Sequence, residues 1–279
     1  MVKLKVCPKL GEDNTILDSG IVPYLNDTFE IQMVSKDLAK SWENCKRVIE
    51  CVGEYTNVKE VILHMPFQYH TLEIIYMSYA KQRELIRLIT SILRYSDKTN
   101  IAIGILFHSD LGTDYLQHEL IEYIKYLLDV IRESKVYLLI ENVMPDIGAY
   151  NIESIPAFEL LQRVEDEKLV CCFDICHFRA SENIVGKSIV IPENIIGRIH
   201  EVHFSATLNN DGFRDKKNTH GVVHNDYVDL DKDLKIVCTI QDYSKDLVVV
   251  IEVAEVDYNN RVNMIAETIM VKEWLDKNC

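Results

Sequence analysis

Residues 101–141 have the sequence IAIGILFHSDLGTDYLQHELIEYIKYLLDVIRESKVYLLIE. The first eight and the last six residues are almost continuously apolar, as expected for strands that are covered on both faces of a parallel sheet. The segment between them, residues 115–134, has apolar side chains at helical spacing. A strand, a helix and a second strand in this order predict a βαβ unit with two parallel strands.

The same alternation continues along the whole chain. Strand-like segments lie at 3–7, 28–33, 59–65, 101–108, 136–141, 169–174, 198–204 and 247–253, and helix-like segments include 74–96, 115–134, 155–166 and 261–277. Eight strands that alternate with helices predict an α/β fold, a closed (β/α)8 TIM barrel. Segment 8–27 is polar and interrupted by Gly and Pro, so we expect an abbreviated first βα unit. With no repeat or linker, residues 1–279 are expected to form a single barrel domain.

Composition narrows the class of protein. Hydrophobic residues make up 48% of the chain, enough for a large core. The net charge of −14 gives little general attraction for DNA and none for an anionic membrane. The N-terminus lacks the features of a signal peptide, and no apolar run is long enough to span a bilayer. Eight scattered cysteines without paired CxxC modules are expected to be reduced, buried side chains of a cytoplasmic protein.

Six polar residues stand at the C-terminal ends of the predicted strands. They are His64, His108, Glu141, Asp174, His203 and Glu252. In a TIM barrel these ends meet on the face that holds the active site. One such residue is commonly structural, but six together would lose hydration or repel one another unless a cation compensates them. Mixed nitrogen and oxygen donors suit a divalent ion, zinc or manganese.

Further histidines flank this set. His177 lies three residues after Asp174, in the loop above the strand end, and His220 lies in the long segment 204–230. His200 is three positions from His203 and is therefore expected on the opposite face of its strand.

The order of these residues resembles the xylose isomerase-like TIM-barrel superfamily, which includes endonuclease IV and many sugar isomerases and epimerases. The resemblance runs from His64 to Glu252. It implies a four-ligand core for one metal ion, made by Glu141, Asp174, His203 and Glu252. Similarity to endonuclease IV implies four more ligands, which are His64, His108, His177 and His220. Asn218 stands where endonuclease IV has an aspartate ligand, so a third metal ion would bind more weakly.

Three functions follow from these ligands. Their number favours an endonuclease IV-like phosphoester hydrolase with several metal ions and with Glu141 as the bridging ligand. The alternative is a sugar or sugar-phosphate isomerase or epimerase with one metal ion, in which Glu141 or Glu252 moves the proton. Acidic charge and an N-terminal region unlike the DNA-binding part of endonuclease IV favour this alternative. In the isomerase we expect His177 and Arg214 to hold hydroxyl or phosphate groups of the substrate. Of the roles open to His224, which are a metal ligand, a residue that supports the ligands and binds substrate, or a solvated loop residue, the last two are favoured. The third function is a barrel that has lost activity and acts as a binding protein.

Overall fold

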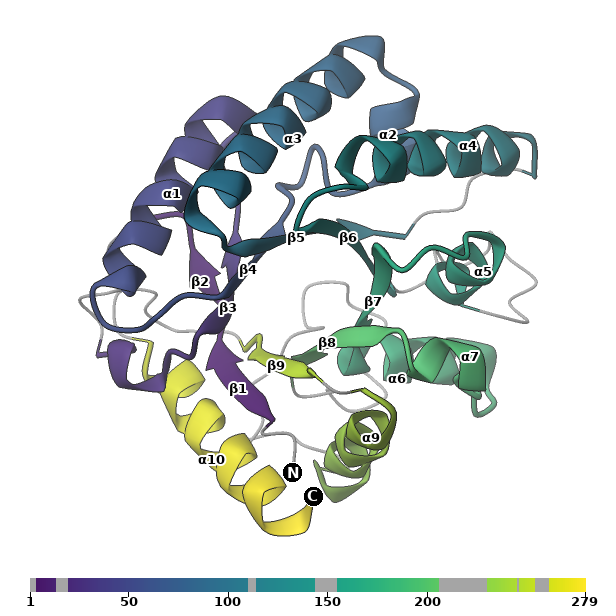
Figure 1. Ribbon diagram of the computed structural model, residues 1–279. Helices are drawn as coiled ribbons and strands as arrows, with labels where there is room; N and C mark the ends of the chain where they lie inside the picture. Colours follow the sequence, from purple (N-terminus) through teal and green to yellow (C-terminus); the bar gives the residue numbers. More distant parts are fainter. Residues whose placement is uncertain are drawn as a thin grey trace.

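The computed structural model describes residues 4–13, 20–109, 114–143, 155–205, 230–244, 246–253 and 261–279. Strands and helices alternate along these segments (Figure 1). The strands are β1 (Lys5–Pro8), β2 (Leu10–Gly11), β3 (Thr28–Gln32), β4 (Glu60–His64), β5 (Ala102–His108), β6 (Val136–Glu141), β7 (Leu169–Asp174), β8 (Ile199–Phe204) and β9 (Val248–Ile251). The helices are α1 (Leu38–Gly53), α2 (Leu72–Tyr76), α3 (Tyr79–Thr99), α4 (Asp114–Ile131), α5 (Pro156–Arg163), α6 (Ile175–Val185), α7 (Glu193–Ile196), α9 (Leu230–Tyr243) and α10 (Val262–Asn278).

The strands form one parallel sheet in the order β1-β9-β8-β7-β6-β5-β4-β3-β2. Strands β1 and β2 are two halves of one strand that is interrupted at Lys9. The first half pairs with β9 and the second half pairs with β3, so the sheet closes on itself. The predicted α/β barrel is therefore confirmed. In the described part of segment 8–27 the only helical element is the short 3-10 helix η2 (Val22–Tyr24), in keeping with an abbreviated first unit.

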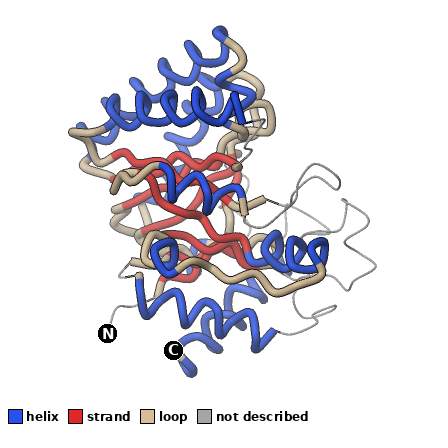
Figure 2. Tube along the Cα trace, turned by 90° about the vertical axis from the view of Figure 1, so that its right-hand side faces the viewer, coloured by secondary structure: helices blue, strands red, loops and turns tan. Residues whose placement is uncertain are grey.

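Helices surround the strands on the outside of the barrel, as the side view in Figure 2 shows. Helix α1 illustrates why they form. The side chain of Asp37 accepts hydrogen bonds from the backbone nitrogens of Ala39 and Lys40 and so caps the first turn. Trp42 and Cys45 then lie on its buried face at helical spacing and pack in the main core.

The inside of the barrel has a small apolar layer of its own. Ile62, Leu106, Leu139 and Cys172, one residue from each of four neighbouring strands, are fully buried in this layer. On β5 a Cβ at Gly104 would lie 2.6 Å from Leu139 Cδ1 and 2.8 Å from Tyr137 Cζ. Glycine is therefore required at this position for the neighbouring side chains to fill the barrel.

A β-bulge in β8 changes which side chains face inward. Cys171 pairs with Ile199, whereas Cys172 pairs with Glu201, so His200 is an additional residue in the ladder. Its Nε2 lies 3.0 Å from Glu60 Oε1, on the far side of the barrel. The expectation that His200 faces away from the interior is therefore wrong, because the bulge interrupts the alternation on which that expectation depends.

The cysteines divide into two groups. Cys238 in α9 and Cys279 after α10 form a disulfide that joins the last two helices, so the expectation of eight reduced cysteines does not hold for this pair. The other six are free, and five of them are buried. None of the described helices is both long and apolar enough to cross a membrane.

Candidate metal centre

The C-terminal ends of six neighbouring strands bring the predicted ligands to one face of the barrel. His64, His108, Glu141 and Asp174 end β4, β5, β6 and β7, while His203 is the penultimate residue of β8 and Glu252 follows β9 directly. His108 and Glu252 are partly exposed at the mouth of the barrel, and the other four are buried. The parallel sheet thus gathers residues that are far apart in the sequence.

Three carboxylates surround one nitrogen of His203. Its Nδ1 lies 3.1 Å from Glu252 Oε2, 3.5 Å from Glu141 Oε1 and 4.0 Å from Asp174 Oδ2. In the sheet, β6 with Glu141 and β9 with Glu252 flank the two strands that carry Asp174 and His203. The four residues predicted as the core of a metal site therefore face a common point.

Asp174 is held in place by its backbone and by one of its own oxygens. The side chain of Asn142 donates to Asp174 O and accepts from Asp174 N, both at 2.8 Å. Asp174 Oδ1 caps α6 by accepting from the backbone nitrogen of His177 at 2.6 Å. The second oxygen, Oδ2, is left to face the cluster.

Several buried polar atoms of the cluster lack a hydrogen-bond partner within the described part of the chain. These include Asp174 Oδ2, Glu141 Oε2 and His203 Nδ1. Each unsatisfied buried group costs about 1–3 kcal/mol, and native proteins keep few of them. A divalent cation would compensate all three, and two carboxylates with an imidazole are donors that zinc and manganese accept. The residues present thus fit a bound divalent metal ion.

A second set of donors meets at the other oxygen of Glu141. The Nε2 atoms of His64 and His108 each lie 3.3 Å from Glu141 Oε2 and 3.3 Å from each other. His64 Nδ1 donates to the carbonyl of Met65 at 3.1 Å, which leaves the lone pair on Nε2. Glu141 is therefore placed between two potential ligand groups, with one oxygen toward each.

Of the remaining predicted site residues, the structure describes only His177. His177 Nδ1 lies 3.6 Å from Glu141 Oε1 and 3.9 Å from Asp174 Oδ2, so this histidine does stand beside the core. The same nitrogen is 3.0 Å from the carbonyl of Asn142, to which it donates. His220, Arg214, His224 and Asn218 lie outside the described residues.

Three charged residues behind the core were not predicted from the sequence. Lys9 Nζ lies 2.8 Å from Glu252 Oε1 and 3.0 Å from Glu30 Oε1. Glu30 Oε2 in turn lies 2.6 Å from His203 Nε2, and Glu201 Oε2 lies 3.8 Å from the same nitrogen. A signal was present: Glu30 and Glu201 are charged residues within apolar strands, and Glu201 is two positions before His203, on the same face.

The pKa values of the buried carboxyl groups of Glu141, Glu30 and Glu201 are shifted in different directions. Burial opposes the ionisation of Glu141, but His108 and His203 outweigh it and hold its pKa well below the usual range. Burial likewise opposes ionisation of Glu30, but Lys9 and His203 lower its pKa to about 2. For Glu201, burial and the charge of Glu30 raise the pKa well above the usual range, which favours a neutral acid. Burial also raises the pKa of the nearby Cys172 thiol, which disfavours a thiolate ligand.

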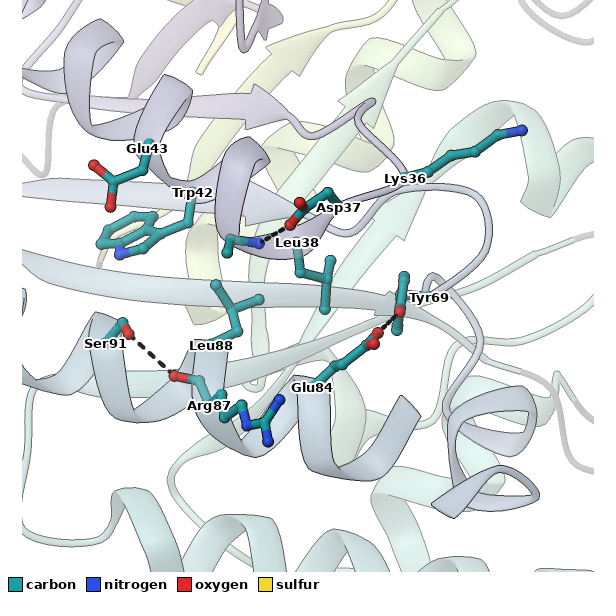
Figure 3. Close-up of a pocket in the computed structure, with 11 residues that line it drawn as sticks. Lys36, Asp37, Leu38, Trp42, Glu43, Tyr69, Glu84, Arg87, Leu88 and Ser91 are labelled. Atoms are coloured by element: carbon teal, nitrogen blue, oxygen red, sulfur yellow. Dashed lines mark hydrogen bonds between the residues drawn. The ribbon is translucent and has the colours of Figure 1, made fainter. Parts of the chain in front are cut away.

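A hollow on the outside of the barrel is separate from this chemistry. It lies at helices α1 and α3, with Trp42, Leu88 and Tyr69 among its lining residues (Figure 3). The hydroxyl of Tyr69 donates to Glu84 at its edge. None of the candidate ligands at the strand ends lines this hollow, so it is separate from the cluster in the barrel mouth.

No known family model matches the sequence, and no curated protein matches it. Solved structures do match along the whole chain. A xylose isomerase domain protein from Planctomyces limnophilus has a TM-score of 0.69 and 12% identity, over 99% of both chains. D-psicose 3-epimerase from Clostridium cellulolyticum H10, solved with D-tagatose, has a TM-score of 0.62 and 12% identity over 98% of both chains. The E. coli 3-keto-D-glucoside 4-epimerase YcjR has a TM-score of 0.59 and 14% identity, over 96% of this chain and 100% of its own. These likenesses show that the chain shares the TIM-barrel fold of these proteins.

Proposed function

We propose that this protein is a divalent-metal-dependent isomerase or epimerase that acts on a sugar or sugar phosphate. The observation that carries the proposal is the convergence of Glu141, Asp174 and Glu252 on His203 Nδ1. The names of the solved structures with the same fold, among them two sugar epimerases, support the same chemistry. This proposal replaces the hydrolase as the preferred function, although the ligand count from the sequence favoured hydrolysis.

The protein would hold one ion, zinc or manganese, with Glu141, Asp174, His203 and Glu252. When bound, such an ion polarises a carbonyl and a neighbouring hydroxyl of the substrate. Glu141 and Glu252 flank the site and are the residues that we propose to move the proton. One carboxylate removes the hydrogen from the carbon next to the carbonyl, and a proton returns to that carbon or to its neighbour. The proton is conserved, so the reaction needs no further reactant.

Deuterium exchange tests this proposal even when the product has not been identified. The metal-loaded protein is incubated in D2O with a panel of ketoses and ketose phosphates, and the substrates are followed by NMR. We expect deuterium to appear at the carbon next to the carbonyl of at least one substrate, and E141Q and E252Q to abolish the exchange. Metal-loaded protein that exchanges no substrate of the panel would count against the isomerase and for the inactive binding protein or the hydrolase.

Phosphoester hydrolysis remains a second candidate because of the triangle formed by His64, His108 and Glu141. A tetrahedral zinc site with bonds of about 2.0–2.1 Å places its ligand atoms about 3.3 Å apart. The three ligand atoms of this triangle are separated by 3.3 Å along each edge. A second ion here would share Glu141 with the core, the arrangement in which two adjacent ions promote attack on a phosphoester.

Metal analysis separates the two candidates. The isomerase predicts about one tightly bound ion per chain, and the hydrolase predicts about two or three. In the second case the double variant H64A/H108A should lose about one ion and keep the ion of the core. Cleavage of abasic-site DNA, or of a simple phosphodiester, by the fully loaded protein would favour the hydrolase, whereas no cleavage together with one ion per chain would exclude it.

A further inference from the structure

The two nitrogens of His203 face different surroundings. Nδ1 faces the carboxylates of the candidate metal centre, whereas Nε2 lies 2.6 Å from Glu30 Oε2 on β3. Both side chains are fully buried. A neutral imidazole has one hydrogen and one lone pair, and the partner of one nitrogen determines which nitrogen is free to bind a metal.

We propose that Glu30 is a positioning residue for the metal centre, because it accepts the hydrogen of His203 Nε2 and thereby keeps the Nδ1 lone pair available to the ion. A carboxylate can only accept in this contact, so the hydrogen has to be on Nε2. Carboxylates behind metal-bound histidines fix the ring and its tautomer in the same way. The inference rests on the proposed metal site, but the role of Glu30 can be tested separately from it.

The contact with Lys9 explains why position 30 needs a carboxylate rather than an amide. Its Nζ lies 3.0 Å from Glu30 Oε1 and can only donate. Lys9 therefore forms an ion pair, outside hydrogen-bond geometry, with one oxygen of Glu30, while the other oxygen accepts from His203. Lys9 also contacts Glu252 Oε1 at 2.8 Å, so one ammonium group connects the residue behind the imidazole with a residue in front of it.

This geometry predicts a specific defect for the isosteric change E30Q. An amide has a single accepting oxygen, which Lys9 will bind, so the NH2 group must face His203. Nε2 then has to accept and the hydrogen moves to Nδ1, where it blocks the metal ion. We expect affinity for Zn²⁺ to fall by about 10- to 100-fold. In the K9M background the amide can turn its oxygen toward His203, so E30Q should have a smaller effect there than in the wild type.

The barrel contains a matched control. Glu60 Oε1 lies 3.0 Å from Nε2 of His200, so this is also a glutamate beside a histidine inside the barrel, but it is only partly buried and lies at the other end. E60Q removes the same charge from the same kind of contact without touching the proposed ligands. We expect its affinity for Zn²⁺ to stay within about twofold of the wild type, because the hydrogen-bond partners of Glu60 are Tyr137 and His200, at the other end of the barrel.

The experiment uses the full chain after removal of metal by a chelator. Zn²⁺ is titrated into the wild type, E30Q, K9M, K9M/E30Q and E60Q, and circular dichroism confirms that each variant is folded. In the same samples, ¹⁵N-edited NMR follows the Nε2–H signal of His203. We expect E30Q alone to lose this signal and to show the large loss of affinity, with the loss reduced in the K9M background.

Two other outcomes would overturn either the role of Glu30 or the proposed function. Zn²⁺ binding by E30Q as tight as that of the wild type would overturn the role of Glu30 and leave the metal site intact. Failure of the wild type to bind Zn²⁺ or Mn²⁺ would overturn the proposed function. In that case the Nε2–H signal decides the inference: its absence from the wild type would overturn the hydrogen bond to Glu30 as well.

Discussion

The two ends of the barrel interior are both polar, but only one of them is satisfied. At the N-terminal ends of the strands, Glu60 Oε1 accepts from the hydroxyl of Tyr137 at 2.9 Å and lies 3.0 Å from His200 Nε2. Among the described residues, none of these three has a buried side-chain atom without a partner. At the C-terminal ends, Glu141 and His203 are more deeply buried than Glu60 and His200 and do have such atoms.

The difference separates a structural network from a binding site. A closed set of donors and acceptors holds the strands together and needs nothing further. A set of buried acceptors with no donors costs stability unless a ligand supplies positive charge. Histidines and glutamates occur at both ends of this barrel, so residue type alone does not distinguish them. Substitutions at the C-terminal end should therefore change metal binding and catalysis, whereas substitutions at the N-terminal end should change the stability of the fold.

The largest contrast is expected between E141Q and E60Q. Glu141 contacts both candidate ligand groups, so replacing its carboxylate should abolish catalysis and remove bound metal. E60Q should keep its metal and most of its activity, since Glu60 contacts only the closed network at the other end. Metal content after gel filtration and deuterium exchange into substrate measure both effects. Full activity in E141Q would show that the centre is placed wrongly.

Removal of the metal should have the next largest effect. An ion that binds only the folded chain adds about 3–4 kcal/mol to the free energy of unfolding at 100 to 1,000 times its Kd. A chelator should therefore lower the melting temperature of the wild type and of E60Q by the same amount. The melting temperature of E141Q should not respond. Equal responses of all three proteins would mean that the chelator acts at another place.

Much of the fold was predictable because buried parallel strands have a strong local signal. The eight predicted strands all exist, and the six candidate ligands at their ends do lie on one face of the barrel. His200 was placed wrongly because a β-bulge, which depends on pairing with a neighbour, has no clear signal in a single strand. The disulfide of Cys279 could not be predicted, because it depends on how α9 and α10 pack.

Glu30, the proposed positioning residue, and its neighbour Lys9 were not predicted for a related reason. In the sequence, a polar residue at the end of an apolar strand indicates a candidate ligand. Glu30 does not meet this condition, because it is in the middle of β3. Lys9 lies in the break between β1 and β2, after the predicted strand 3–7 and within segment 8–27, for which the sequence predicts no regular strand. Contacts across a barrel join strands far apart in the sequence, so only the closed sheet brings these residues to His203.

A smaller effect, confined to stability, is expected for G104A. The added Cβ would lie 2.6 Å from Leu139 Cδ1 and 2.8 Å from Tyr137 Cζ, so it should force Tyr137 away from Glu60. Overpacking of this kind costs about 1–3 kcal/mol. The control G53A adds a Cβ with no atom within 4 Å, at the end of α1, and should be neutral or slightly stabilising. Urea unfolding of the two variants gives the comparison. A stability of G104A equal to that of G53A would show that the interior is not tightly packed.

The smallest effect concerns pH and the closed network alone. Burial opposes ionisation of Glu60, but His200 and Tyr137 outweigh it and lower the pKa of this carboxyl. A lowered pKa contributes stability above the unfolded value of about 4.3, and this contribution is lost as the pH falls through the folded value. The difference in unfolding free energy between wild type and E60Q, measured in chelator, should therefore be constant near neutral pH and shrink below about pH 4.3. A difference that grows in acid would mean that Glu60 is held as a neutral acid. The N-terminal end would then not be the satisfied half of the barrel.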